Sequence, residues 1–285
     1  MGVERAIFPP FLAEAILTDY DKSLSNSRRE ISPRTWEVLR QAFVQSLPIG
    51  LCTGRTFPLV LGFLSQFPAD YLHIVGGGGQ VVDSRGNVRW SQELSGEVLG
   101  KVCRQVQNLG GWFGFAQGDT FFGHREILSR MATVTGVKME QIDANLIPAK
   151  WNTPLIVVGG LTPKLIAFVE SLPGIAHKKM VSYAGDDYYD ITAKGVTKAR
   201  ALVAWSELTK IPLAKVVGIG DGLNDIEFLQ QVGWPVVMSN SHPDLLRQAS
   251  VVIGHVDEDG WPKYVSGLLS HLAAMQSPQN NGGKL

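Results

Sequence analysis

The chain has 285 residues, of which 45% are hydrophobic and 18% charged, and its 26 basic and 26 acidic side chains give no net charge. This composition favours a globular protein of one large or two smaller domains and excludes a largely disordered chain. A neutral chain has no overall basic field for nucleic acid or a membrane surface, and no apolar run reaches the ~18 residues of a membrane span. Two cysteines, Cys52 and Cys103, are too few for a disulfide framework. Because no charged-then-apolar leader is evident, we expect a cytoplasmic protein with reduced thiols.

The first part of the chain alternates strand-like and helix-like segments. An apolar strand is predicted at 13–18, and Ser32 followed by Pro33 is typical of a helix start. The segments that follow are a strand at 49–52, a helix at 58–67 and a strand at 71–75. Strands that alternate with helices predict a parallel sheet with crossover helices.

The middle of the chain loses this strict alternation, which indicates a separate α+β module. Its predicted helices are 94–108 and 163–172, and its predicted strands are 112–116, 154–158 and 180–184. The alternation then returns with helices at 195–208, 223–232 and 260–275 and strands at 214–219, 235–238 and 251–253. We therefore predict an α/β core formed by residues 1–82 plus 188–285, with an α+β cap inserted at 83–187.

Polar motifs follow the ends of several predicted strands. Asp19-Tyr20-Asp21 follows the first strand, where open α/β sheets bind ligands, although a solvated turn is the favoured explanation of this motif when it is taken alone. Gly220-Asp221-Gly222-Leu223-Asn224-Asp225 follows strand 214–219, and a helix cap needs only one of its three polar side chains. The second motif therefore favours a functional site.

Two further segments supply groups that bind phosphate. Thr53-Gly54-Arg55 follows strand 49–52 and combines a hydroxyl, a flexible backbone and a guanidinium, although an ordinary turn accounts for it when it is taken alone. Lys198 lies in the predicted helix 195–208 and can point back toward the strand ends, whereas most helix lysines face solvent. Carboxylates that converge at one sheet edge repel unless a cation lies among them, and their hard oxygens indicate Mg²⁺.

In this order the motifs resemble those of the haloacid dehalogenase (HAD) superfamily of phosphohydrolases, in the Cof-type branch with a large α+β cap. The resemblance rests on DYDKSL, TGR, GVTK and GDGLND, followed by VVMSNSHPDLL and DEDGW. It implies a Rossmann-like parallel-sheet core with an inserted cap that sets substrate specificity. The segment PVVMSN to DGW is also similar to the mannosyl-3-phosphoglycerate and sucrose-phosphate phosphatases.

The resemblance also implies a role for each motif residue. Asp19 would be the nucleophile, and Asp21 would protonate the leaving oxygen and then activate water. Mg²⁺ would bind the Asp19 carboxylate, the Asp21 carbonyl and Asp221, with Asp225 ordering its waters. The residues implied to bind phosphate or substrate are Thr53, Gly54, Arg55, Lys198 and Asn224.

The chain departs from the family pattern at two places. Lys22 and Ser23 replace a Gly and a Thr, so the turn gains bulk and charge where Gly eases a tight backbone. Gly78-Gly79 replaces an Asn-Gly at the cap entrance, and we expect the run Gly76–Gly79 to be a flexible hinge.

The predicted activity is Mg²⁺-dependent hydrolysis of a small phosphate ester, either a sugar phosphate or a phosphoglycerate-type ester, by a monomer or small homo-oligomer. A phosphosugar mutase and a non-catalytic HAD-like binding protein are the alternatives. The aromatic residues of the predicted cap, which are Trp112, Phe113, Phe115, Phe121 and Phe122, fit either a substrate pocket or the cap core, and the core is favoured.

Overall fold

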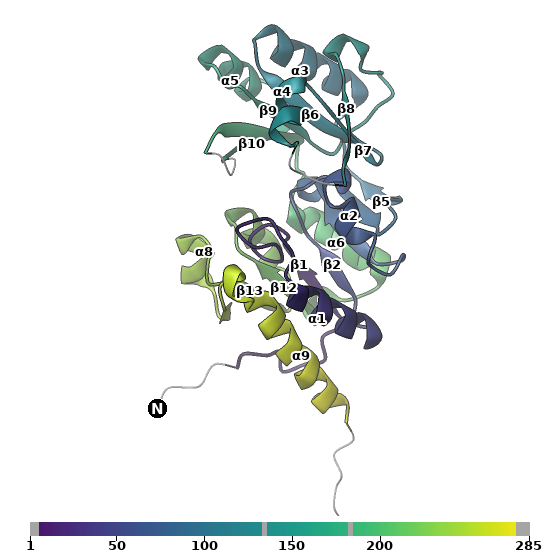
Figure 1. Ribbon diagram of the computed structural model, residues 1–285, viewed down its shortest axis with the longest axis vertical. Coiled ribbons are helices and arrows are strands. Elements are labelled where there is room, and N and C mark those ends of the chain that lie inside the picture. The colour runs from purple at the N-terminus through teal and green to yellow at the C-terminus, as the bar shows by residue number, and fades with distance from the viewer. Residues whose placement is uncertain (1–5, 133–135, 182–184, 278–285) are drawn as a thin grey trace, which may run out of the picture. The chain divides into compact units, whose positions relative to one another are not determined.

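A computed structural model describes residues 6–132, 136–181 and 185–277 of the chain. Two compact units are found, one formed by residues 1–51 with 209–285 and the other by residues 52–208. Figure 1 shows the course of the chain and labels most of its helices and strands. Within the described residues no helix combines the length and apolar character of a membrane span.

The first unit is built on a parallel sheet whose strands are ordered β14-β13-β12-β1-β2. These strands are β1 (Ala15–Thr18), β2 (Ile49–Leu51), β12 (Val216–Gly220), β13 (Trp234–Met238) and β14 (Val252–Ile253). All five were predicted as strands, and the parallel sheet is confirmed. The two central strands, β1 and β12, are buried along their whole length, as expected of a sheet covered on both faces.

Two helices of this unit, α1 (Pro33–Val44) and α8 (Pro243–Gln248), begin at a residue whose side chain caps the first turn. The unit also contains α7 (Ile226–Leu229) and α9 (Gly260–Gln276), with short 3₁₀ turns η4 (Leu213–Lys215), η5 (Leu223–Asp225) and η6 (Val256–Glu258). The Ser32 hydroxyl accepts from the Thr35 amide at 3.1 Å, which confirms the predicted cap of α1. This helix buries Val38, Leu39 and Ala42 and contacts α9. Burial of a large aliphatic side chain such as Leu39 stabilises the folded state by about 1.5–3 kcal/mol.

The second unit contains a three-stranded antiparallel sheet ordered β3-β4-β5. Its elements are η1 (Phe57–Leu59), α2 (Leu61–Leu64), β3 (Leu72–Val75), η2 (Gly76–Gly78), β4 (Gln80–Asp83) and β5 (Val88–Ser91), and α6 (Lys198–Thr209) also belongs to the unit. The prediction that strand 71–75 joins the parallel sheet was wrong, because β3 pairs with β4 through a tight glycine turn. A single parallel bridge between Cys52 and Ile74 links this strand to the residue that follows β2 within the described residues.

The second unit also contains a six-stranded mixed sheet ordered β10-β11-β9-β6-β7-β8. Its strands are β6 (Trp112–Gln117), β7 (Thr120–Gly123), β8 (Lys138–Gln141), β9 (Ile156–Gly159), β10 (Ile175–Val181) and β11 (Asp187–Ala193). Its other elements are α3 (Gly96–Asn108), α4 (Arg125–Arg130), η3 (Ala144–Leu146) and α5 (Pro163–Glu170). The strand predicted at 180–184 overlaps the end of β10, and its last three residues lie outside the described ranges. β11 extends this sheet beyond the predicted end of the cap at residue 187, and the functional division into core and cap stays a prediction.

The six-stranded sheet divides the aromatic residues of the predicted cap between its two faces. Phe113 and Phe115 pack in a core with α3 and α5, as predicted. Trp112 and Phe121 belong to a second cluster on the opposite face, together with Ile127 of α4. Since side chains alternate along a strand, neighbouring aromatics in the sequence WFGF lie on opposite faces.

Candidate active site

Asp19 lies directly after β1, at the carboxyl end of the parallel sheet. Its amide donates to the Ile219 carbonyl at 2.8 Å, which continues the pairing of β1 with β12, and its side chain is buried. The preceding Thr18 hydroxyl donates to the Asp19 carbonyl at 2.9 Å and accepts from Trp261 Nε1 at 3.1 Å. The backbone of Asp19 is therefore held on both sides, by β12 and by the first turn of α9.

Asp21 lies in a tight turn that runs from Tyr20 to Ser25. The Tyr20 carbonyl accepts from the amides of Leu24 at 3.1 Å and Ser25 at 2.8 Å. Lys22 has a φ of +59°, the left-handed conformation that favours glycine. The turn therefore keeps the backbone expected of the family's glycine even though a lysine occupies the position.

Asp221 and Asp225 lie at the end of β12. The Asp225 Oδ2 atom accepts from the amides of Asp221 at 3.1 Å and Gly222 at 2.9 Å, so this fully buried carboxylate fixes the loop that carries Asp221. A side chain at Gly220 would place its Cβ 2.8 Å from the Asp225 carboxylate, so glycine permits this close approach. Ser23 Oγ donates to Asp221 Oδ1 at 3.2 Å and ties the two strand-end loops together.

Asp19, Asp221 and Asp225 together form a group of carboxylates. One oxygen of each lies within 4.8 Å of the others, which is near the separation of about 3–4 Å for oxygens that share one Mg²⁺. Carboxylates this close repel unless a cation or proton compensates them. The donor set of hard oxygens therefore fits a divalent cation such as Mg²⁺.

In the second unit, the glycine run holds the Thr53-Gly54-Arg55 turn. The amides of Gly76 and Gly77 donate to the carbonyls of Arg55 at 2.8 Å and Thr53 at 3.1 Å. The Thr53 hydroxyl accepts from the Arg55 amide at 3.1 Å. These bonds connect the run to the turn, and the flexible hinge expected here stays a prediction.

The same run approaches the start of α6, where Lys198 lies. A Cβ at Gly78 would come within 2.2 Å of the Thr197 carbonyl oxygen, and Gly78 has a φ of +99°. Lys198 is buried, with 4% of its surface exposed. Thus, one part of this unit brings together the Thr53 turn, the glycine run and the residues that begin α6.

Asp190 on β11 is a site candidate that we did not predict. The register Asp190–Val157–Gly114 places it on the sheet face that carries Trp112, opposite the face that packs against α3 and α5. Its cross-strand neighbour is Lys178 on β10. Burial raises the pKa of Asp190 to about 7, and the positive charge of Lys178 opposes this rise. In the sequence Asp190 lies within the strand DYYDITA, and no local pattern distinguishes it from an ordinary carboxylate on a strand.

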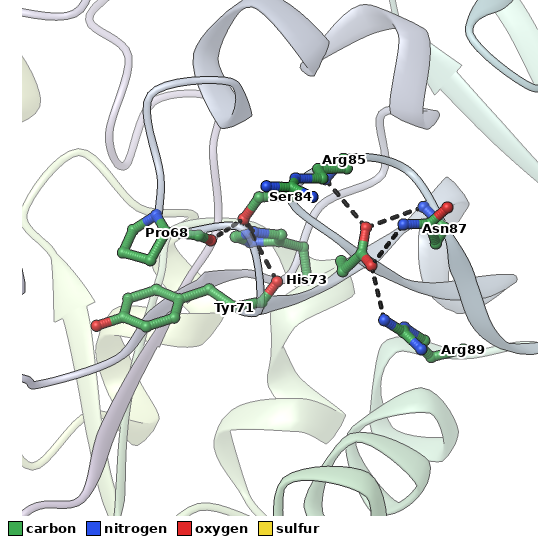
Figure 2. A network of polar contacts seen from close by, with 8 residues as sticks. Pro68, Tyr71, His73, Ser84, Arg85, Asn87 and Arg89 are labelled. Atoms are coloured by element: carbon green, nitrogen blue, oxygen red, sulfur yellow. Dashed lines mark hydrogen bonds and ion pairs between the residues drawn. The ribbon is translucent and has the colours of Figure 1, made fainter.

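A polar network around His73 and Ser84 is structural rather than nucleophilic (Figure 2). Ser84 Oγ donates to the Pro68 carbonyl at 2.8 Å, so it accepts the 2.9 Å bond from His73 Nε2 and has no proton to lose to this ring. Nearby, the Asp83 carboxylate accepts from Asn87 and Arg89, which close the turn between β4 and β5. Both His73 and Ser84 are buried, and the network fixes the ends of the antiparallel sheet.

Comparison with known proteins identifies the family. The sequence profile of the haloacid dehalogenase-like hydrolases matches residues 16–265. An HMP-PP phosphatase of Serratia proteamaculans is 24% identical over 272 residues, which cover 92% of this chain and 97% of that protein. An HMP-PP phosphatase of Citrobacter koseri is 21% identical over 279 residues, which cover 94% of this chain and all of that protein.

Solved structures show the same fold. A haloacid dehalogenase-like hydrolase from Bacteroides thetaiotaomicron superposes with a TM-score of 0.79 at 20% identity, covering 90% of this chain and 99% of that one. A sugar phosphatase of HAD subclass IIB superposes with a TM-score of 0.72 at 20% identity, covering 89% and 98%. With the profile spanning most of the sequence, the chain belongs to the haloacid dehalogenase-like hydrolases.

Proposed function

We propose that this protein is a Mg²⁺-dependent phosphatase that hydrolyses a small phosphorylated metabolite through an aspartyl-phosphate on Asp19. The observation that carries the proposal is the convergence of the Asp19, Asp221 and Asp225 carboxylates at the end of the parallel sheet. The family supports a hydrolase, and the relatives named HMP-PP phosphatase and sugar phosphatase support a phosphate ester as the substrate.

The first step transfers the phosphoryl group to the protein. A carboxylate oxygen of Asp19 attacks phosphorus, the bond from phosphorus to the ester oxygen breaks, and Asp21 gives its proton to the departing alkoxide. Asp19 suits this role because β12 and Thr18 hold its backbone, so the carboxylate needs little reorganisation.

The second step releases phosphate. Asp21, now ionised, takes a proton from a water molecule as the water oxygen attacks phosphorus, and the bond to Asp19 breaks. The products are inorganic phosphate, a free Asp19 carboxylate and a protonated Asp21, ready for another cycle.

The residues proposed to hold Mg²⁺ are the side chains of Asp19 and Asp221 and the carbonyl of Asp21, with Asp225 fixing the Asp221 loop. When bound, the ion would reduce the repulsion between the Asp19 carboxylate and the phosphate. The proposed phosphate-binding and substrate-binding groups are Thr53, Gly54, Arg55, Lys198 and Asn224.

The substrate class is proposed from the cap and from the relatives. We propose that residues 83–187 form a cap that selects the leaving group, and that the substrate is a sugar phosphate, a phosphoglycerate-type ester or a related small phosphate such as that of the HMP-PP phosphatases. A cap that closes over the phosphate group would exclude macromolecules.

The test is phosphate release from a panel of phosphorylated metabolites, with Mg²⁺ and with EDTA. Hydrolysis that requires the metal is expected for wild type and for Asp119→Asn, an exposed carboxylate on the loop between β6 and β7, and no turnover for Asp19→Asn. Acid quenching followed by mass spectrometry should find one phosphoryl group on the peptide that contains Asp19. Isomerised sugar phosphate without free phosphate would instead indicate a mutase, and binding without turnover would indicate a non-catalytic protein.

A further inference from the structure

The turn that carries Asp21 contains a residue in an unfavourable backbone conformation. Lys22 has a φ of +59°, and in this conformation the Cβ of an L-residue crowds the following carbonyl oxygen. Lys210, which follows α6, has a φ of +62° and is also exposed, so the chain contains a second lysine in the same conformation. Strain of this kind persists only where surrounding contacts hold it in place.

Asn240, in the segment after β13, provides such a contact. Its side-chain Nδ2 donates to the Lys22 carbonyl at 2.8 Å across 218 residues of sequence. Its Oδ1 accepts from the Val256 amide at 2.9 Å. Because the Val256 amide can only donate, this second bond fixes which end of the Asn240 amide points toward Lys22.

The same segment also reaches the second loop of the site. The His242 amide donates to the Asp221 carbonyl at 3.1 Å, while Ser23 donates to the Asp221 carboxylate at 3.2 Å. The segment from Asn240 to His242 therefore contacts the main chain of both strand-end loops. Loss of the Asn240 bond would remove one support of the Asp21 turn without removing any group that is proposed to touch a substrate.

We propose that Asn240 is a positioning residue that holds the Lys22 peptide in its left-handed conformation and thereby places Asp21 for proton transfer. This inference rests on the proposed function, because it assigns Asn240 to the same site. It predicts that the need for Asn240 depends on the residue at position 22, since glycine adopts the left-handed conformation without help.

A double-mutant cycle measures this dependence. The four proteins are wild type, Asn240→Ala, Lys22→Gly and the double variant, with kcat/KM as the readout because it reports phosphoryl transfer to Asp19 and not the later hydrolysis. We expect Asn240→Ala to lower kcat/KM by about tenfold in the wild-type background and by less than about twofold in the Lys22→Gly background. The bond from Val256 to Asn240 is lost in both backgrounds, so its effect on kcat/KM cancels when the two losses are compared.

Two leaving groups separate positioning of the acid from general damage. Phenyl phosphate and p-nitrophenyl phosphate have similar shapes, but phenolate leaves less readily and needs the proton from Asp21 more. The loss caused by Asn240→Ala should therefore be several-fold larger for phenyl phosphate. An equal loss for both esters, or an equal loss in both backgrounds, would overturn the inference.

Matched variants keep the test decisive. Lys210→Gly makes the same substitution at the same φ, and it should not restore activity to Asn240→Ala. If Asn240→Ala fails to fold, Asn240→Asp replaces it, because this variant keeps the acceptor for Val256 and removes the donor to Lys22. Wild type that hydrolyses neither these esters nor any member of the metabolite panel with Mg²⁺ would overturn the proposed function and the inference together, whereas active wild type with additive substitutions would overturn only the role of Asn240.

Discussion

The buried His73 should make the protein lose stability as the pH falls below neutrality. Burial lowers its pKa from the ordinary 6.5 to about 3, although the charge of Asp83 opposes the shift. The folded protein therefore excludes a proton that the unfolded chain binds. Above the pKa of the unfolded chain this burial costs no stability. As the pH falls from that pKa to about 3, the unfolded chain binds the proton and the free energy of unfolding decreases.

The size of the effect follows from the two pKa values. Between pH 7 and pH 5 the unfolded chain gains most of one proton while the folded protein gains almost none, which corresponds to about 2 kcal/mol of unfolding free energy. The variant His73→Gln does not titrate, and its amide can still donate to Ser84 in place of the ring nitrogen.

The assay is urea unfolding of both proteins at pH 7 and pH 5, followed by tryptophan fluorescence. The wild type should lose about 2 kcal/mol more than His73→Gln over this interval, because all other titrating groups are common to both. His177→Gln, at an exposed position on β10, is the control and should behave as wild type does. Equal losses for wild type and His73→Gln would refute the reasoning.

Three further outcomes are expected. Burial raises the pKa of Asp190 to about 7 from its ordinary 3.8, so the contribution of this group to stability falls as the pH rises from 4 to 7; over this range the melting temperature of wild type should decline relative to that of Asp190→Asn. Asp225→Asn should weaken Mg²⁺ binding by about tenfold or more in calorimetry, since it removes one of the three converging charges, and unchanged affinity would contradict the proposed site. Gly78→Ala should cost about 3 kcal/mol or more in denaturant unfolding, because its Cβ would lie 2.2 Å from the Thr197 oxygen; Gly77→Ala, also at positive φ but with open space, should cost clearly less.

The parallel sheet could be predicted from the sequence because its strands are short apolar runs followed by turn residues. The same patterns placed Asp19 and Asp221 at neighbouring strand ends, where the structure brings their carboxylates together. Lys22 was predicted to occupy a position suited to glycine, and its φ of +59° agrees with that prediction.

The remaining elements had weaker signals. β8 and β10 carry mostly exposed residues and show no apolar alternation, and α4 and α8 span only six residues each. Asn240 could not be linked to Lys22, because a side chain that bonds a main-chain carbonyl 218 residues away leaves no local pattern. The raised pKa of Asp190 depends on burial, which only the folded sheet reveals.

The strand order of the parallel sheet has a consequence for synthesis of the protein. β1 pairs with β2 on one edge and with β12 on the other, and β12 follows β1 by about 200 residues. At about 5–20 residues per second, a ribosome takes roughly 10–40 s to supply the missing neighbour. During that interval the contiguous second unit, residues 52–208, emerges complete, whereas the other edge of β1 stays without its partner strand. The nascent chain therefore exposes an unpaired apolar strand edge beside Asp19, and a chaperone that binds β1 would protect this edge until β12 is synthesised.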